Sequence, residues 1–186
     1  MGLKTLQSQQ KDKPVLKESK WINYSLTFLF FSGLVLTVFE INIFRKTIID
    51  WKIPTGIWLG VGLISLRWLR TYLAENYNTK NVFLQLVFCV GSFGGIFAYG
   101  FMATNYYLLN NNEPKIIKTS ITKTGHLAKG RNGCGNPYAY VKIKGVEKEL
   151  IFPCNLEIEK YEFVLVTLQR GLLGFDRILD QIPESE

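Results

Sequence analysis

Apolar residues gather in three long runs before residue 112, whereas short apolar and polar stretches alternate after it. A helix needs about 20 mostly apolar residues, each rising about 1.5 Å, to cross a hydrocarbon core of about 30 Å. Each run meets or approaches that length, and charged residues separate the runs. The pattern therefore predicts a polar tail over 1–21 and a three-helix transmembrane domain over 22–109, with helices at about 22–44, 54–73 and 82–108.

The second run is the weakest of the three. Its uncharged part extends from Ile53 to Leu66, which suits a re-entrant segment as well as a span. Apolar residues continue beyond Arg67, and an arginine near a helix end can extend its side chain to the headgroups. We therefore expect a span over 54–73. If this run does not cross, the C-terminal part of the chain lies on the other side of the membrane.

Lysine and arginine residues flank the three runs unequally. Short cytoplasmic segments are enriched in these cations, so their distribution predicts the orientation. The polar tail and the connection after the second run carry Lys4, Lys11, Lys13, Lys17, Lys20, Arg67, Arg70 and Lys80, whereas the connection after the first run carries Arg45, Lys46 and Lys52. This bias predicts a cytoplasmic N-terminus and an extracytoplasmic C-terminal domain. The economy of the chain is typical of a bacterial inner-membrane protein.

The C-terminal part alternates apolar and polar residues in short segments, as half-buried strands do. Gly145 indicates a tight hairpin, and the apolar turn Gly171–Phe175 caps the core or docks on the bilayer or a partner. The strands are expected at 116–122, 138–144, 148–152 and 163–169. The predicted fold class is thus membrane α + β, with three transmembrane helices, a small, mainly antiparallel β domain over 113–180 and a frayed C-terminus over 181–186.

Composition and charge agree with this class. The chain is 47% hydrophobic and 20% charged, and its formal net charge of +7 is spread over the tail and the connections. No recognition motif or stripe of basic and aromatic residues accompanies the charge, so we expect no nucleic-acid partner. The expected partners are the lipid bilayer and a membrane or envelope protein.

Two G-x-x-x-G spacings indicate close helix packing. Gly56 and Gly60 lie in the second run, and Gly91 and Gly95 lie in the third, where Ala98 continues the same face. Small residues at this spacing let helix backbones approach closely in lipid. Either the second and third helices pack on each other within one chain, which we favour, or the small residues form the seam of a homo-oligomer.

Polar residues inside the runs are sparse. Glu40, Arg67, Gln85 and Asn105 all fall within a few turns of an expected membrane interface. An intramembrane charge marks a functional site by default. Because no acidic residue falls near the middle of a helix, we interpret Glu40, Arg67 and Gln85 as polar anchors at the membrane boundary rather than as parts of an ion pathway.

Two cysteines lie in the expected β domain. Cys134 and Cys154 would close a loop of about 20 residues, and their disulfide would stabilise a small extracytoplasmic domain by roughly 3 kcal/mol. The alternative is a pair of free thiols. His126 adds a third ligand type, but the paired spacing of a zinc site is missing. We therefore expect no metal and no cofactor.

The sequence contains no specific catalytic motif. The chain has one histidine and contains neither a G-x-S-x-G motif nor a phosphate-binding loop. The expected function is a non-enzymatic membrane module that displays a β domain at the membrane surface for protein or envelope interaction. The alternatives are an oligomeric transport or channel component and, less favoured, a membrane-bound enzyme.

Overall fold

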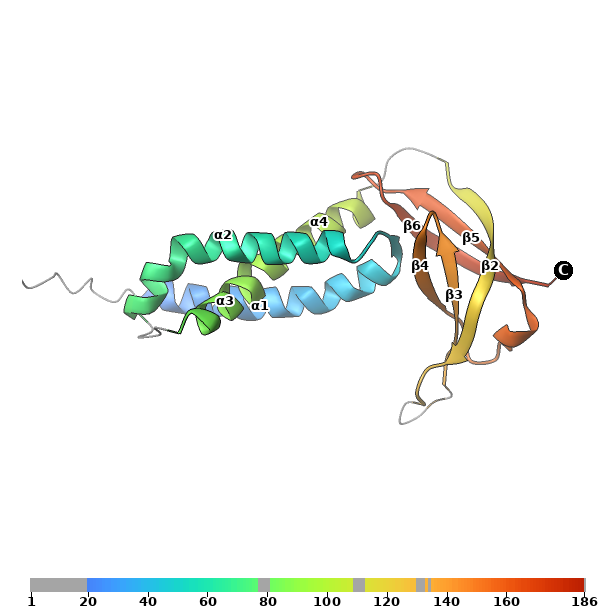
Figure 1. Cartoon of the computed structure of the whole chain (residues 1–186), viewed down its shortest axis with the longest axis horizontal. Coiled ribbons are helices and arrows are strands. Elements are labelled where there is room, and N and C mark those ends of the chain that lie inside the picture. The colour runs from blue at the N-terminus through green and yellow to red at the C-terminus, as the bar shows by residue number, and fades with distance from the viewer. Residues whose placement is uncertain (1–19, 77–80, 109–112, 130–132, 134, 186) are drawn as a thin grey trace, which may run out of the picture.

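The computed structural model describes residues 20–76, 81–108, 113–129, 133 and 135–185. The helices form an elongated bundle at one end of the molecule, and the strands form a curved sheet at the other end (Figure 1). The helical elements are α1 (Lys20–Arg45), α2 (Lys52–Asn76), α3 (Val82–Cys89), the π-helical turn η1 (Val90–Gly94) and α4 (Gly95–Tyr107).

The elements α3, η1 and α4 follow one another without a break, so they make one long third helix. Asn81 caps its start, because the side-chain oxygen accepts a hydrogen bond from the amide of Phe83 at 2.9 Å. Within the π-helical turn, the Ser92 hydroxyl donates to the Phe88 carbonyl at 2.6 Å, so the buried hydroxyl is satisfied inside the helix. Single π-helical turns interrupt α-helices rarely and often at functional positions.

Two helices are long and apolar enough to cross a membrane among the residues described here, Trp21–Arg45 and Val82–Tyr107. The sequence predicted three, so the expected second span does not meet this criterion. The reason is the composition of α2, in which Arg67 and Arg70 follow a short uncharged stretch. Length and composition alone support membrane insertion weakly, because core helices of soluble proteins can share both properties.

The strands form a six-stranded sheet in the order β1-β6-β5-β2-β3-β4, in which all neighbours are antiparallel. The long strand β2 pairs with β5 along its first half and with β3 along its second half, with a shift in register between Ile121 and Lys123. This shift curls the sheet towards a barrel. The strands are β1 (Thr47–Ile48), β2 (Lys115–His126), β3 (Pro137–Ile143), β4 (Val146–Ile151), β5 (Phe163–Arg170) and β6 (Asp176–Glu184), with the 3₁₀ turn η2 (Ile158–Lys160) before β5.

A side-chain hydrogen bond links the edge strand β4 to β6, which lies beside the other edge strand β1. The Gln181 amide of β6 donates to the Ile151 carbonyl of β4 at 2.6 Å. Inside, alternate residues of the strands form one core, in which Val141, Ile158, Val164 and Val166 have no exposed surface. The antiparallel β domain predicted from the alternating pattern is therefore present and nearly closed.

Two parts of the sheet differ from the prediction. The expected frayed C-terminus is wrong from residue 181 to Glu184, because β6 pairs with β5 as far as Glu184 opposite Phe163. The strand β1 was not expected at all, since its two residues come from the connection between the first two helices. The strand β1 depends on a partner that is distant in the sequence, whereas β6 forms a hairpin with the strand that precedes it.

Candidate functional site

The sheet is joined to the bundle through the α1–α2 connection. Thr47 and Ile48 pair with Arg177 and Asp176 of β6, and the Ile178 amide donates to the Lys46 carbonyl at 2.8 Å. These contacts place the C-terminal end of α1 and the N-terminal end of α2 directly against the sheet. The joint is made of backbone hydrogen bonds, so it holds the sheet in a fixed position relative to the helix ends.

A second joint forms where the β5–β6 turn meets the end of α4. The fully buried Asn105 amide donates to the Phe175 carbonyl at 3.0 Å, and its oxygen accepts from the amides of Leu173 at 3.1 Å and Phe175 at 3.3 Å. The Leu172 amide also donates to the Leu108 carbonyl at 2.9 Å. The apolar turn expected to cap the core or dock elsewhere therefore docks on the chain's own third helix.

Arg177 strengthens this joint from β6. Its guanidinium donates to the Tyr106 carbonyl at 3.0 Å and to the Gln169 side chain at 2.8 Å, and it lies 5.5 Å from the centre of the Tyr106 ring. A cation near the last carbonyls of a helix complements the negative end of the helix dipole. The charge of Arg177 thus stabilises the contact between β6 and α4.

Lys148 of β4 makes the corresponding contact with α1. Its side chain is buried, with the residue 4% exposed, and its ammonium donates to the Phe44 carbonyl at 3.0 Å while lying 3.7 Å from the centre of the Phe44 ring. Burial lowers the pKa of Lys148 to about 8. A charge that can titrate near neutral pH therefore lies at the joint between the sheet and the first helix.

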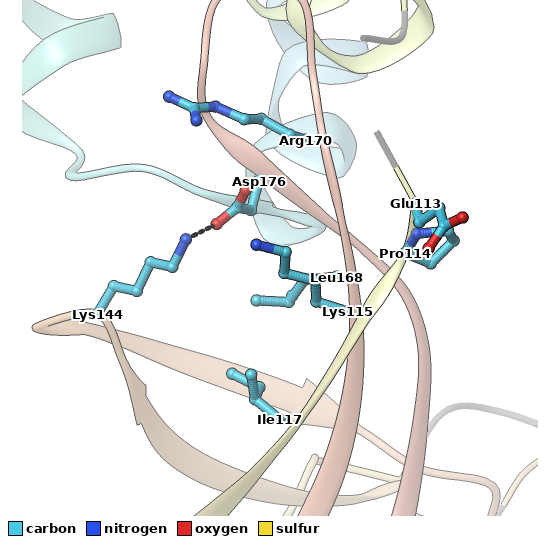
Figure 2. Close-up of a pocket in the computed structure, with 8 residues that line it drawn as sticks. All are labelled: Glu113, Pro114, Lys115, Ile117, Lys144, Leu168, Arg170 and Asp176. Atoms are coloured by element: carbon cyan, nitrogen blue, oxygen red, sulfur yellow. Dashed lines mark hydrogen bonds and ion pairs between the residues drawn. The ribbon is translucent and has the colours of Figure 1, made fainter. Parts of the chain in front are cut away.

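A pocket of about 550 Å³ opens at the end of the sheet that faces the helices (Figure 2). Ile117 and Leu168 provide the apolar part of the lining, and charged side chains surround it. The pocket is lined by Glu113, Pro114, Lys115, Ile117, Lys144, Leu168, Arg170 and Asp176. It combines three cations with two carboxylates.

The charged residues of the pocket differ in their partners. Lys144 forms an ion pair with Asp176, whose side chain is only 11% exposed. Lys115 and Arg170 make no ion pair within the described part of the chain. Arg170 is the register partner of Asp176, and Lys115 is the register partner of Leu168, so these side chains share one face of the sheet. The arrangement can attract an anion.

The two G-x-x-x-G motifs lie in different environments. A Cβ atom added to Gly95 would lie 2.6 Å from the Gly33 carbonyl oxygen of α1, and Gly91 lies against Phe30 of α1. Gly56 and Gly60 have no atom within 4 Å of such a Cβ atom. The third helix does pack on α2 within one chain, as we favoured, but Gly56 and Gly60 face open space rather than that contact.

The third helix packs between the other two, and glycines outside those motifs take part alongside Gly91 and Gly95. Gly33 of α1 faces Gly91 and Ser92, so Gly33 and Gly91 make a close approach of two backbones. Gly62 of α2 faces Val90, and a Cβ atom on Gly94 would lie 2.5 Å from the Trp58 carbonyl oxygen. Ala98, which continues the Gly91 face, is fully buried.

The polar residues expected at the membrane boundary differ in their surroundings. Glu40 lines a groove of about 300 Å³ between α1 and α2, together with Phe44, Trp51 and Trp58. Arg67 is exposed on α2, and Gln85 is buried in the bundle with 2% of its surface exposed. The groove is mainly apolar, and Glu40 is the acidic residue among those that line it.

The cysteines can be placed in part. Cys89 is a buried free thiol, and Cys154 is disulfide-bonded. Cys134 lies outside the described residues, so its pairing with Cys154 stays a prediction. His126 ends β2, and no group of three or more histidine, cysteine, aspartate or glutamate side chains within the described ranges could hold a metal ion.

Sequence reasoning missed the residues of the joint. Asn105 was noted as a polar residue in a helix, but nothing nearby in the sequence indicates its partners some 70 positions later. Lys148 occurs in an alternating strand, where a lysine usually faces solvent. The hairpin that carries Lys144 to the pocket was predicted from Gly145, since a two-residue hairpin turn requires unusual backbone conformations, but its ion pair with Asp176 was not.

Comparison with known proteins found no matching family model, no matching curated protein and no matching solved structure.

Proposed function

We propose that this chain is an integral membrane protein with three spans, whose bundle presents the β domain at the membrane surface as a non-enzymatic recognition module. The outward faces of all three helices support this proposal. Large apolar side chains are exposed along them, including Phe28 and Phe31 on α1, Leu63 and Ile64 on α2, and Phe83 and Phe97 on the third helix. An apolar face of this extent on a bundle suits contact with lipid.

The geometry of the bundle supports a span for α2 despite its lower hydropathy. The α1–α2 connection and the end of α4 both contact the sheet, so the helices run up, down and up between the same two levels. A bilayer that contains α1 and the third helix then contains the middle of α2. Arg67 and Arg70 lie towards the end of α2 that is remote from the sheet, where their side chains can reach the headgroups.

The observation that carries the proposal is the double joint between bundle and sheet. The pairing of β1 with β6 and the three hydrogen bonds of Asn105 hold the domain in a fixed position on the helix ends. A domain fixed in this way presents the same surface to whatever lies at the membrane. We place the N-terminus in the cytoplasm and the domain outside a bacterial inner membrane, as the cation bias indicates.

Two experiments test the proposal. Extraction of membranes with alkaline carbonate should leave the full chain in the membrane pellet, and release into the supernatant would contradict membrane integration. Topology reporters at residue 10, at residue 77 and at the C-terminus should then read inside, inside and outside. A C-terminal reporter on the inside would overturn the three-span arrangement, most simply because α2 does not cross.

A further inference from the structure

The pocket at the helix-facing end of the sheet contains more positive charge than its own carboxylates neutralise. Lys115 of β2 and Arg170 of β5 are free of ion pairs among the residues that the structure describes. Because Lys115 lies opposite Leu168, Arg170 is its diagonal neighbour on the same face. Diagonal neighbours on paired strands lie about 7–8 Å apart at the backbone. In Figure 2 the Arg170 guanidinium points away from the Lys115 ammonium, towards the β5–β6 turn near Gly174, so its long side chain must rotate for both cations to contact one small anion.

The third cation is held in place by an unusual backbone. Lys144 has a φ of 50° and Gly145 has a φ of 83°, so both residues of the β3–β4 turn are left-handed. Glycine and asparagine favour such positions, whereas a lysine there is strained. The ion pair with Asp176 fixes the Lys144 ammonium at the pocket, and it also neutralises the carboxylate that lies opposite Arg170 (Figure 2).

The place of the pocket in the molecule indicates where its ligand comes from. Asp176 pairs with Ile48 of the α1–α2 connection, and the turn after Arg170 contacts Asn105 at the end of α4. The pocket therefore lies at the level of the helix ends, where the headgroups of a surrounding leaflet would be. Ile117 and Leu168 give the pocket an apolar wall beside its cations.

We propose that this pocket binds the phosphate group of a membrane phospholipid, with Lys115 and Arg170 as its ligands and Lys144 as the third cation at the rim. Arg170 can contact two phosphate oxygens at once, and Lys115 supplies a compact charge. The apolar wall takes the glycerol-ester part of the same lipid, which a free phosphate lacks. This inference rests on the proposed function, because it assumes that the helices lie in a bilayer.

The test compares lipid affinities of the full chain in neutral detergent, measured by native mass spectrometry. Phosphatidylglycerol is titrated into the native chain and into each variant. The double variant Lys115→Gln/Arg170→Gln should lose about tenfold in affinity for phosphatidylglycerol, which equals about 1.4 kcal/mol. The matched control Lys123→Gln/Lys129→Gln removes the same charge from the far end of β2 and the segment that follows it. Its affinity should stay within about twofold of that of the native protein.

Equal losses in the two double variants would overturn the proposal, because a general effect of net charge would then explain them. Unchanged affinity in Lys115→Gln/Arg170→Gln would also overturn it. Glycerol phosphate distinguishes the source of the phosphate: it should bind more weakly than phosphatidylglycerol, and equal binding would overturn the assignment to a lipid. The lipid titrations are done in detergent micelles, so they do not depend on membrane integration. A failure of the proposed function would show separately, as release of the chain by carbonate.

Discussion

Replacing Asn105 by alanine should loosen the sheet from the third helix. The side chain is fully buried, and it makes three hydrogen bonds with the β5–β6 turn. The Phe175 carbonyl keeps a second donor, because the Gly171 amide also donates to it at 2.9 Å. The amides of Leu173 and Phe175 lose the Asn105 oxygen, so the variant leaves two donors without that acceptor.

The size of the effect follows from these two donors. A buried donor without a partner costs about 1–3 kcal/mol, and the cost falls where water can reach it. Leu172 and Leu173 are 50% and 40% exposed, so water can hydrate part of the turn. We therefore expect Asn105→Ala to lower the free energy of unfolding by roughly 2–4 kcal/mol.

Hydrogen exchange and thermal unfolding in detergent measure this loss. The amides of Leu173 and Phe175 should exchange faster in Asn105→Ala, and the unfolding temperature should fall. Asn42→Ala is the matched control, because Asn42 is an exposed residue of α1 and its change should stay within about 0.5 kcal/mol. If the two variants unfold alike and the two amides keep their protection, Asn105 does not hold the turn.

Three further predictions address the bundle, the buried lysine and the disulfide. Gly95→Leu should lower the free energy of unfolding by about 1–3 kcal/mol or more, because the new side chain would clash with the backbone of α1. Gly60→Leu, which faces open space, should not lower it, and equal effects of the two variants in thermal unfolding would contradict this packing. Because the pKa of Lys148 is about 8 in the folded chain and 10.5 ordinarily, the unfolded chain binds the extra proton between these values. Stability should therefore rise from about pH 8 to pH 10.5 by up to about 3 kcal/mol, and Lys148→Met should lack this part of the rise in denaturant titrations; an identical pH profile for both would refute it. Non-reducing peptide mapping should find Cys134 joined to Cys154, and alkylation of both thiols in untreated protein would exclude the bond.

The disulfide prediction gains support from the described residues around Cys154. The Phe152 amide donates to the Pro137 carbonyl at 2.8 Å, and the Asn136 side-chain oxygen lies 2.9 Å from the Cys154 sulfur. The segment that follows Cys134 therefore runs beside Cys154. Bonded cysteines need Cα atoms within about 7 Å, a condition that adjacent segments can meet.

The strands that were predicted correctly are those whose signal is local. In β3 the residues alternate between buried and less buried positions, and Gly145 marks the following turn. In β6 the pattern is weaker, and Pro183 with the acidic residues around it resembles a terminus. Pairing with β5 nevertheless extends through Glu184, because a neighbouring strand supplies the hydrogen bonds that the local sequence does not indicate.

The glycine motifs show the same division between local and distant information. The spacing of Gly91 and Gly95 correctly indicated a surface that lets a helix approach closely, since spacing is a property of one helix. The spacing does not indicate which helix packs against this surface. Gly33 faces them as a single glycine in α1, where Thr37 rather than a second glycine stands four positions later and also faces Gly95, so a search for G-x-x-x-G does not find this face.

The joint between bundle and sheet brings together segments from four regions of the chain. The α1–α2 connection supplies β1, α4 supplies Asn105, β4 supplies Lys148, and the β5–β6 hairpin contacts the first two. Each contribution is a short segment whose contacts do not follow a helical or strand period, so it leaves no periodic pattern in the sequence. The basic pocket lies beside this joint, so a change in the docking of the sheet would also move its cations relative to the helix ends. Asn105→Ala should therefore weaken phosphatidylglycerol binding along with stability, although Asn105 does not line the pocket.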